Sequence, residues 1–228
     1  MKSAIPPDET PNECRRCGEC CRRGGPALHA LDRPLIEKGL IPAACLYTIR
    51  AGEPVRDNVA GRHALAETDI IKIKGLDDDW TCFFLDADGN GCKIYKDRPV
   101  ECRCMQCWDT RAIEALYTRE RLSRRDLLGK VEGLWELIAH HEQRCAYTRL
   151  QQLSTQLASD DRAGAMTEIK EMVRYDESLR RLLVEKGQAR ADMLEFLLGR
   201  PLTRTLPGFH IQVARDGDRT RLVYSPLT

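Results

Sequence analysis

Four cysteines within eight residues constrain this chain more than any other feature. They form the sequence CRRCGECC at residues 14–21. Two residues between successive cysteines turn their sulfur atoms toward one point, which is the usual arrangement in thiolate metal sites. A packed apolar core has no need of this spacing. We therefore expect the first part of the chain to fold around bound metal.

Seven further cysteines follow, at positions 45, 82, 92, 102, 104, 107 and 145. Residues 1–13 lack the apolar stretch of a signal peptide, and no segment approaches the roughly 20 apolar residues of a membrane span. Clustered cysteines in a reducing compartment indicate metal or redox sites rather than disulfides. The sequence therefore predicts a cytoplasmic protein that does not enter a membrane.

Charge and length limit the possible partners and the number of domains. The 228 residues carry 36 Lys and Arg against 35 Asp and Glu, so no net charge draws the chain to nucleic acid. An apolar fraction of 42% is ordinary for a globular protein. The length suits one large domain or two small ones. We therefore expect no nucleic-acid partner.

The first hundred residues contain short elements separated by loops. Asp32, Pro34 and Gly39 predict a helix over residues 32–39, with the proline in its first turn. Apolar patterning predicts strands at 47–50 and 70–74. Residues 80–85 and 92–95 are expected to pair as a hairpin. Pro99 is expected to open a helix that carries Cys102 in its first turn.

Residues 109–199 show the spacing of amphipathic helices almost throughout. Ser123 and Asp126 predict a capping box, in which each residue bonds the backbone of the other. Near the end, the sequence Asp-Gly-Asp at 216–218 lies between two apolar stretches and predicts a hairpin. The predicted class is thus α+β: a small loop-rich metal domain with short antiparallel strands, then a helical region and a terminal hairpin. The expected domain boundaries are a disordered lead at 1–12, the metal domain at 13–110, the helical region at 111–200 and the hairpin at 201–228.

A second set of cysteine motifs lies between residues 82 and 107. The segment 92–103 reads CKIYKDRPVECR, and CFFL stands at 82–85. Together with CRRCGECC, these segments resemble the YkgJ-type cysteine-cluster family, whose pattern is CxxCxxCC, then CxxL, then CxIYxxRPxxCR. That family is described as a zinc- or iron-chelating domain, and the resemblance covers about residues 14–110.

The resemblance and the cysteine spacing together predict eight metal ligands. They are Cys14, Cys17, Cys20, Cys21, Cys82, Cys92, Cys102 and Cys107. Eight thiolates suffice for two sites of four. Six arginines flank these cysteines and are expected to offset the negative charge of a thiolate site: Arg15, Arg16, Arg22, Arg23, Arg98 and Arg103.

The identity of the metal stays open between two chemistries. Three cysteines from one loop with a remote fourth are how many four-iron clusters are held. Structural zinc sites more often use two pairs of cysteines. Because Cys20 and Cys21 are adjacent and point differently, they favour either a cluster with spare thiols or two neighbouring metals. The sequence thus predicts an iron–sulfur cluster (4Fe-4S) first and zinc second.

Each chemistry implies a function. An iron–sulfur cluster implies electron transfer or cluster-assisted chemistry. Zinc implies a structural module whose helical region binds a protein partner, because all-thiolate zinc sites are usually closed. Exchangeable thiols would instead suit metal storage or delivery. No catalytic residue is predicted, since the sequence holds no GxGxxG, P-loop, nucleophile-elbow or HExxH motif.

Other candidate residues are assigned structural roles. His29 lies close to the first cluster and is expected to be a hydrogen-bonded structural histidine, while Cys45 is expected to be buried. His141 and Cys145 share one helix face, but one helix supplies only two ligands, so both are expected in the core. Cys104 is a spare ligand or a reactive thiol. The loop from Asp86 matches only half of a calcium-binding pattern and is expected to be a turn.

Overall fold

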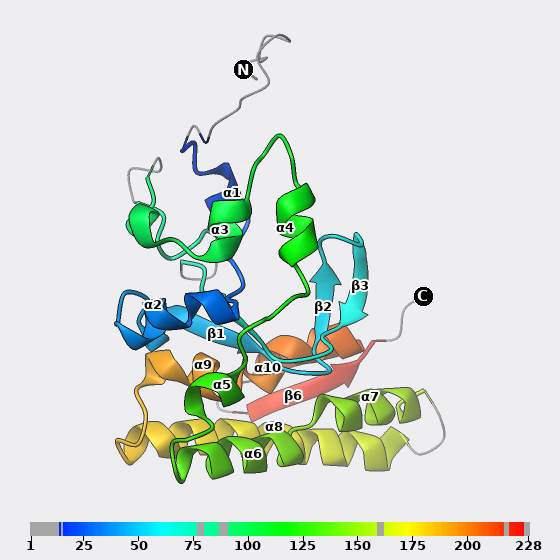
Figure 1. Ribbon diagram of the computed structural model, residues 1–228. Coiled ribbons are helices and arrows are strands. Elements are labelled where there is room, and N and C mark those ends of the chain that lie inside the picture. The colour runs from blue at the N-terminus through cyan, green and yellow to red at the C-terminus, as the bar shows by residue number, and fades with distance from the viewer. Residues whose placement is uncertain are drawn as a thin grey trace. The chain divides into compact units, whose positions relative to one another are not determined.

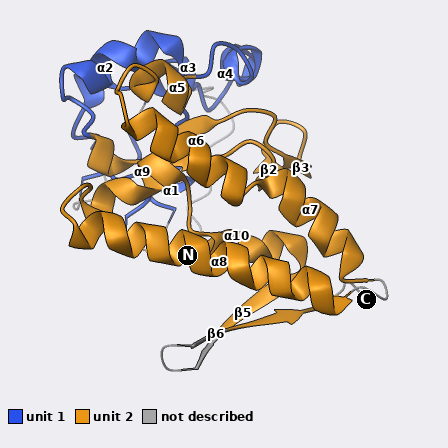
Figure 2. Ribbon diagram, turned by 90° about the horizontal axis from the view of Figure 1, so that it is seen from below, with its two compact units in different colours: residues 1–42, 73–121 blue, residues 43–72, 122–228 orange. Residues whose placement is uncertain are grey.

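The chain folds as two compact units, each built from two separate stretches of sequence (Figures 1 and 2). Unit 1 consists of Met1–Pro42 and Ile73–Arg121, and unit 2 consists of Ala43–Lys72 and Leu122–Thr228. The computed structural model describes residues 14, 16–76, 80–86, 91–158, 162–216 and 219–225. The lead at 1–12 and most of the calcium-like loop therefore lie outside the described residues.

Unit 1 is built from short helices joined by loops. Its α-helices are α1 (Glu19–Arg22), α2 (Arg33–Glu37), α3 (Val100–Cys104) and α4 (Arg111–Leu116), and its 3-10 helices are η1 (Ala30–Asp32) and η3 (Tyr95–Asp97). Pro34 lies in the first turn of α2, and Gly39 follows that helix with a φ of 72°. Pro99 is the N-cap of α3, so Cys102 falls in the first turn as predicted.

The core of unit 1 is small and mixed. Its buried apolar residues are Ala27, Leu28, Ile41, Ile73, Cys82, Phe84, Leu85 and Val100. Gly25 packs directly on the chain, because an added Cβ atom would lie 2.2 Å from the carbonyl oxygen of Ile73. Three buried polar residues, His29, Asp32 and Glu101, complete this core. A fold with so few buried apolar side chains needs other interactions to hold its loops together.

The predicted hairpin at 80–95 forms only in part. Within the described residues the two segments form no regular strands and pair at one isolated antiparallel bridge, between Leu85 and Cys92, while Cys82 bridges to Gly75 outside both segments. The predicted strands at 47–50 and 70–74 are confirmed as β1 (Leu46–Ile49) and β4 (Ile70–Ile73), which pair with each other. A segment with alternating apolar residues forms a regular strand only where a partner strand offers backbone groups for hydrogen bonding.

Unit 2 holds two antiparallel hairpins. Strand β2 (Pro54–Asp57) pairs with β3 (Arg62–Leu65), with Val55 opposite Ala64. The predicted terminal hairpin is confirmed as β5 (Ile211–Asp216) and β6 (Arg219–Tyr224), with Val213 opposite Leu222. Together with the helices, these pairs confirm the α+β class.

The predicted helical region is also confirmed in unit 2. Its helices are α5 (Arg124–Leu128), α6 (Leu134–Arg144), α7 (Tyr147–Gln156), α8 (Arg162–Glu185), α9 (Leu194–Leu198) and α10 (Leu202–Thr205), with 3-10 helices η2 (Ala43–Cys45), η4 (Ala191–Met193) and η5 (Leu206–Phe209). The Ser123–Asp126 capping box starts α5 as predicted. Gly187, with a φ of 64°, follows the end of α8.

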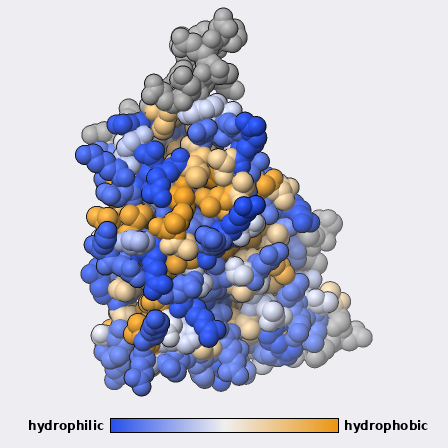
Figure 3. All heavy atoms as spheres, viewed as in Figure 1, coloured by the Kyte–Doolittle hydropathy of each residue, from blue (hydrophilic) through white to orange (hydrophobic). Residues whose placement is uncertain are grey.

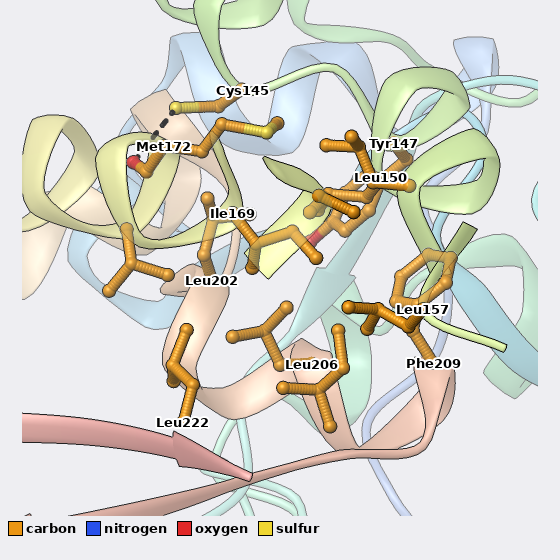
Figure 4. Packing of buried hydrophobic residues seen from close by; sticks show 14 residues of the cluster. Cys145, Tyr147, Leu150, Leu157, Ile169, Met172, Leu202, Leu206, Phe209 and Leu222 are labelled. Carbon is orange, nitrogen blue, oxygen red and sulfur yellow. Dashed lines mark hydrogen bonds between the residues drawn. The ribbon is translucent and has the colours of Figure 1, made fainter. Parts of the chain in front are cut away.

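Helix α8 is the long helix against which other helices of unit 2 pack. It contacts α6, α7 and α10, and Figure 1 shows α6 and α7 running along it. The apolar core around it is drawn in Figure 4. Its residues are Cys145, Tyr147, Leu150, Leu153, Leu157, Ala165, Ile169, Met172, Val173, Leu202, Leu206, Phe209, Ile211 and Leu222. This cluster gives unit 2 a conventional hydrophobic core of its own.

Polar and charged residues cover most of the face seen in Figure 3, with an apolar area among them. The exposed apolar side chains include Leu31, Trp80 and Phe83 of unit 1, with Trp80 64% exposed. Among the helices in the described residues, none combines the length and the apolar character that crossing a membrane would require.

A buried arginine joins distant segments of unit 2. The Arg124 guanidinium donates to Asp69 Oδ2 at 2.8 Å, to Glu142 Oε1 at 2.7 Å and to the Leu197 carbonyl at 2.9 Å. Its side chain is 2% exposed, so these bonds replace water that the guanidinium has lost. Glu142 Oε1 also accepts a hydrogen bond from Arg50 Nη1 at 3.4 Å.

We predict that Arg124→Met lowers the free energy of unfolding by about 3 kcal/mol, because it leaves Asp69 and Glu142 without their shared cation. Urea denaturation of the purified protein measures this loss. The neighbouring exposed Arg125→Met is the control and should change stability by less than about 0.5 kcal/mol. Equal effects of the two substitutions would contradict the role given to the Arg124 network.

Candidate metal centre

The first cysteine cluster forms a turn that leads directly into α1. Gly18 takes a φ of 76°, a left-handed conformation that suits glycine, and α1 begins at the next residue. Cys20 and Cys21 therefore lie on the helix, while Cys17 lies before it. The Arg22 side chain donates to the Cys17 carbonyl at 2.9 Å and closes the turn. This local geometry gathers the first cysteines of the chain.

A backbone hydrogen bond joins the first cluster to the CFFL motif at residues 82–85. The Cys82 amide donates to the Cys21 carbonyl at 2.7 Å. Cys82 is buried, and Cys92 follows through its bridge with Leu85. Two cysteine motifs that are far apart in sequence therefore lie side by side.

An aromatic ring joins the first cluster to the motif at residues 92–103. The Arg16 guanidinium lies 4.1 Å from the centre of the Tyr95 ring, and the Arg98 guanidinium lies 4.0 Å from it. Arg98 also donates to the Tyr95 carbonyl at 3.1 Å, and Arg103 donates to the Arg98 carbonyl at 3.2 Å. The arginines predicted to offset charge near the thiols thus also fix the backbone of these loops.

The thiols in this part of unit 1 influence one another. A hydrogen bond with Cys21 lowers the pKa of Cys20 to about 6, and the same bond raises the pKa of Cys21. Burial raises the pKa of Cys102, and the neighbouring Cys82, Cys20 and Cys92 raise it further. Negative charge on one sulfur therefore opposes ionisation of the others. A bound cation would relieve this repulsion.

The remaining predicted ligands belong to the same unit. Burial, followed by the charges of Cys20, Cys17 and Cys14, raises the pKa of Cys107. Each of the eight predicted ligands is thus close enough to another to influence, or be influenced by, its ionisation. All eleven cysteines fall within the described residues, and none of them forms a disulfide. Thiolates of this kind suit zinc, iron and iron–sulfur clusters.

His29 has the structural role predicted for it. Its Nδ1 atom lies 2.7 Å from the Arg119 carbonyl, and its Nε2 atom lies 3.1 Å from Glu101 Oε1. The other oxygen of Glu101 accepts the Ala27 amide at 2.7 Å. The Asp32 carboxylate connects the same two segments, because it accepts hydrogen bonds from the His29 amide at 3.0 Å and from the Val100 amide at 2.8 Å. These bonds anchor the start of α3, which carries Cys102.

Cys45 and Cys145 both lie in unit 2 and are buried, with exposures of 5% and 0%. His141 is also fully buried, so the prediction that it and Cys145 lie in the core is confirmed. Sequence reasoning missed their third neighbour. Asp176 approaches from α8, and no spacing along the chain relates it to His141.

We predict that His29 stabilises the protein more at low pH than at high pH. Burial alone would lower its pKa, but Glu101 and the Arg119 carbonyl outweigh burial and raise it. The stabilisation is therefore complete below the ordinary pKa of about 6.5 and is lost as the pH rises through the raised folded value. The difference in unfolding free energy between the wild-type protein and His29→Gln should be larger at about pH 6 than at about pH 9.

Denaturation at the two pH values measures this difference. The exposed His63→Gln is the matched control and should show a negligible difference at both values. A His29→Gln effect that does not change with pH would contradict the ion-pair role of His29.

Comparison with known proteins agrees with the cysteine geometry. A family model named CxxCxxCC, described as "Putative zinc- or iron-chelating domain", matches residues 13–126, which is half of the chain. No curated protein matches the chain, and no solved structure matches it. The matched residues include all eight predicted ligands and the anchoring residues His29, Asp32 and Glu101. The chain therefore belongs to the CxxCxxCC family of cysteine-rich chelating domains.

Proposed function

We propose that unit 1 binds an iron–sulfur cluster and that the protein acts in electron transfer or cluster-assisted chemistry. The observation that carries the proposal is the hydrogen bond between the Cys82 amide and the Cys21 carbonyl, because it brings two distant cysteine motifs together. The mutual effects of the thiols on their pKa values support the same convergence. The family description of a zinc- or iron-chelating domain is consistent with both metals.

The proposed ligands are the eight cysteines predicted from the sequence. One group of thiols lies on α1, on α3 and in the segment between these helices. The second group lies before α1 and after α3. The first group contains Cys20, Cys21, Cys82, Cys92 and Cys102, and the second contains Cys14, Cys17 and Cys107. Cys20 influences members of both groups. This division suits either one cluster with additional thiols or two neighbouring metals.

Positive side chains among the cysteine motifs suit a metal centre held by thiolates. A cluster or ion held by four thiolates carries a net charge of about −2, which positive side chains nearby would offset. Arg16 and Arg98 stack on Tyr95 within the cysteine motifs, and Arg22 bonds the Cys17 carbonyl. Positive charge beside a cluster raises its reduction potential, because the more negative reduced state gains more. The arginines would thus help the cluster to accept an electron.

A second candidate is a zinc-stapled module that binds a protein partner through its helices. All-thiolate zinc sites are usually closed and structural. The observation that favours this candidate is the ligand set itself, because the eight proposed ligands are all cysteines that form no disulfide.

Metal analysis of protein purified without air separates the two candidates. We expect a brown protein that contains iron and acid-labile sulfide and bleaches when dithionite reduces it. Absorption spectroscopy and elemental analysis measure these properties. A colourless protein with stoichiometric zinc would contradict the iron–sulfur proposal and favour the structural module.

Two cysteines on α3 provide a matched test of the ligand set. Cys102 is coupled to three other thiols, whereas Cys104 lies two residues further along the same helix and is not a proposed ligand. We predict that Cys102→Ser loses at least half of the bound metal, because serine is a poor ligand for these metals. Cys104→Ser should retain the wild-type content. Elemental analysis after anaerobic purification measures both, and equal metal content in the two variants would contradict the assignment.

A further inference from the structure

Three side chains with metal-binding atoms meet in the interior of unit 2. His141 lies on α6, Cys145 follows that helix as its C-cap, and Asp176 lies on α8. Their ligand atoms all lie within 4.8 Å of one another. The three residues are at most 1% exposed. None of them belongs to the cysteine-rich motifs described above.

Asp176 is fully engaged by hydrogen bonds. Its Oδ1 atom accepts from His141 Nε2 at 2.7 Å and from Arg180 Nε at 2.9 Å. Its Oδ2 atom accepts the Leu202 amide at 3.0 Å. The carboxylate therefore holds the imidazole in place. A carboxylate that accepts the distal N–H of a histidine is the usual support of a metal-binding imidazole.

The other ring nitrogen of His141 has no such support. Its Nδ1 atom is buried and has no hydrogen-bond partner among the described residues. Because Nε2 carries the proton that Asp176 accepts, Nδ1 carries a lone pair. Burial lowers the pKa of His141 and favours this neutral state. A buried nitrogen lone pair without a partner costs free energy unless something binds it.

The second donor is the thiol of Cys145. It lies one helical turn beyond His141, since the Cys145 amide donates to the His141 carbonyl at 2.9 Å. Its Sγ atom is 3.8 Å from the Met172 carbonyl, an approach drawn in Figure 4. Metal bonds of about 2.3 Å to sulfur and about 2.0 Å to nitrogen place two facing donors about 4 Å apart. The ligand atoms of His141, Cys145 and Asp176 all lie within 4.8 Å of one another when one ring nitrogen is counted for the histidine, so the thiol lies beside the imidazole.

We propose that Cys145 Sγ and His141 Nδ1 form a second metal site that is specific for copper(I), a soft monovalent cation. Asp176 positions the imidazole and is not itself a ligand. On binding, the S–H bond of the thiol breaks, a sulfur–metal bond forms and one proton leaves to the solvent. The ion keeps its oxidation state throughout. Thiolate sulfur is a ligand that copper(I) prefers, and imidazole also binds copper.

Charge selects a monovalent ion over zinc. Around the site, the guanidiniums of Arg50, Arg124 and Arg180 pair with the carboxylates of Asp69, Glu142 and Asp176. The three positive charges and the three negative charges balance. A monovalent ion that replaces the thiol proton keeps them balanced, whereas a divalent ion would add one uncompensated positive charge to a desolvated region. With Asp176 engaged, the site also offers two donors rather than the four that zinc prefers.

A surface groove gives the ion a route to the site. It has a volume of about 800 Å³ and lies over α6, α7 and α8 of unit 2. Met172 and Tyr175 line it. The same two residues border the site, because the Met172 carbonyl faces Cys145 and the Tyr175 ring stacks on His141 at 6.4 Å between ring centres. Two residues that line the groove therefore also contact the donors.

Nitrogen NMR of the imidazoles tests the site in the wild-type protein. The full-length protein, with its cysteine-rich centre loaded, is titrated with copper(I) acetonitrile complex under anaerobic conditions. We expect the Nδ1 resonance of His141 to move and to saturate at one added equivalent beyond any copper taken up by unit 1. A resonance that stays in place at several equivalents would overturn the proposal. This readout does not depend on any variant remaining folded.

Variants locate the second donor. Cys145→Ala should abolish the movement of the His141 resonance and lower the copper capacity by one ion per chain, measured by competition with bicinchoninate. Cys45→Ala removes another buried thiol of unit 2 and should leave both unchanged. A His141 resonance that moves equally in Cys145→Ala, or a capacity lost equally in both variants, would show that the thiol is not a ligand.

Discussion

The contact on which unit 1 depends is the hydrogen bond between the Cys82 amide and the Cys21 carbonyl. It forces thiols from two motifs into one region, where each ionised sulfur disfavours the next. A small unit with a short list of buried apolar side chains gains little from the hydrophobic effect to oppose that repulsion. A cation bound by the thiolates would reverse the sign of this interaction, so metal binding and folding of unit 1 are coupled in the proposed function.

Unit 2 is stabilised differently. Its apolar cluster around α8 provides the core, and the buried guanidiniums of Arg124 and Arg180 pair with the carboxylates of Asp69, Glu142 and Asp176. Arg124 alone bonds three segments that are remote in sequence. Such pairs contribute little net stability when intact but are costly to break, so they favour one arrangement of the chain over others. This unit needs no metal to account for its fold.

The two proposed metal sites differ in the way they are built. In unit 1, thiols crowd together near the surface, and arginines fix the surrounding backbone through Tyr95. In unit 2, one thiol and one imidazole nitrogen are buried, and a carboxylate fixes the imidazole. The first arrangement suits clusters or ions with several thiolates, and the second suits a soft ion with two ligands.

The sequence by itself determined the elements whose cause is local. The CRRCGECC turn, the proline before α3, the Ser123–Asp126 cap and the terminal hairpin follow from residues within a few positions of one another. Spacing and resemblance also predicted which cysteines to consider. Only the tertiary structure decided the division into two discontinuous units, the reduction of the hairpin at 80–95 to one isolated bridge, and the meeting of Asp176 with His141 and Cys145. Such contacts join segments far apart in the chain, and their geometry is set by packing rather than by any periodicity that a sequence can show.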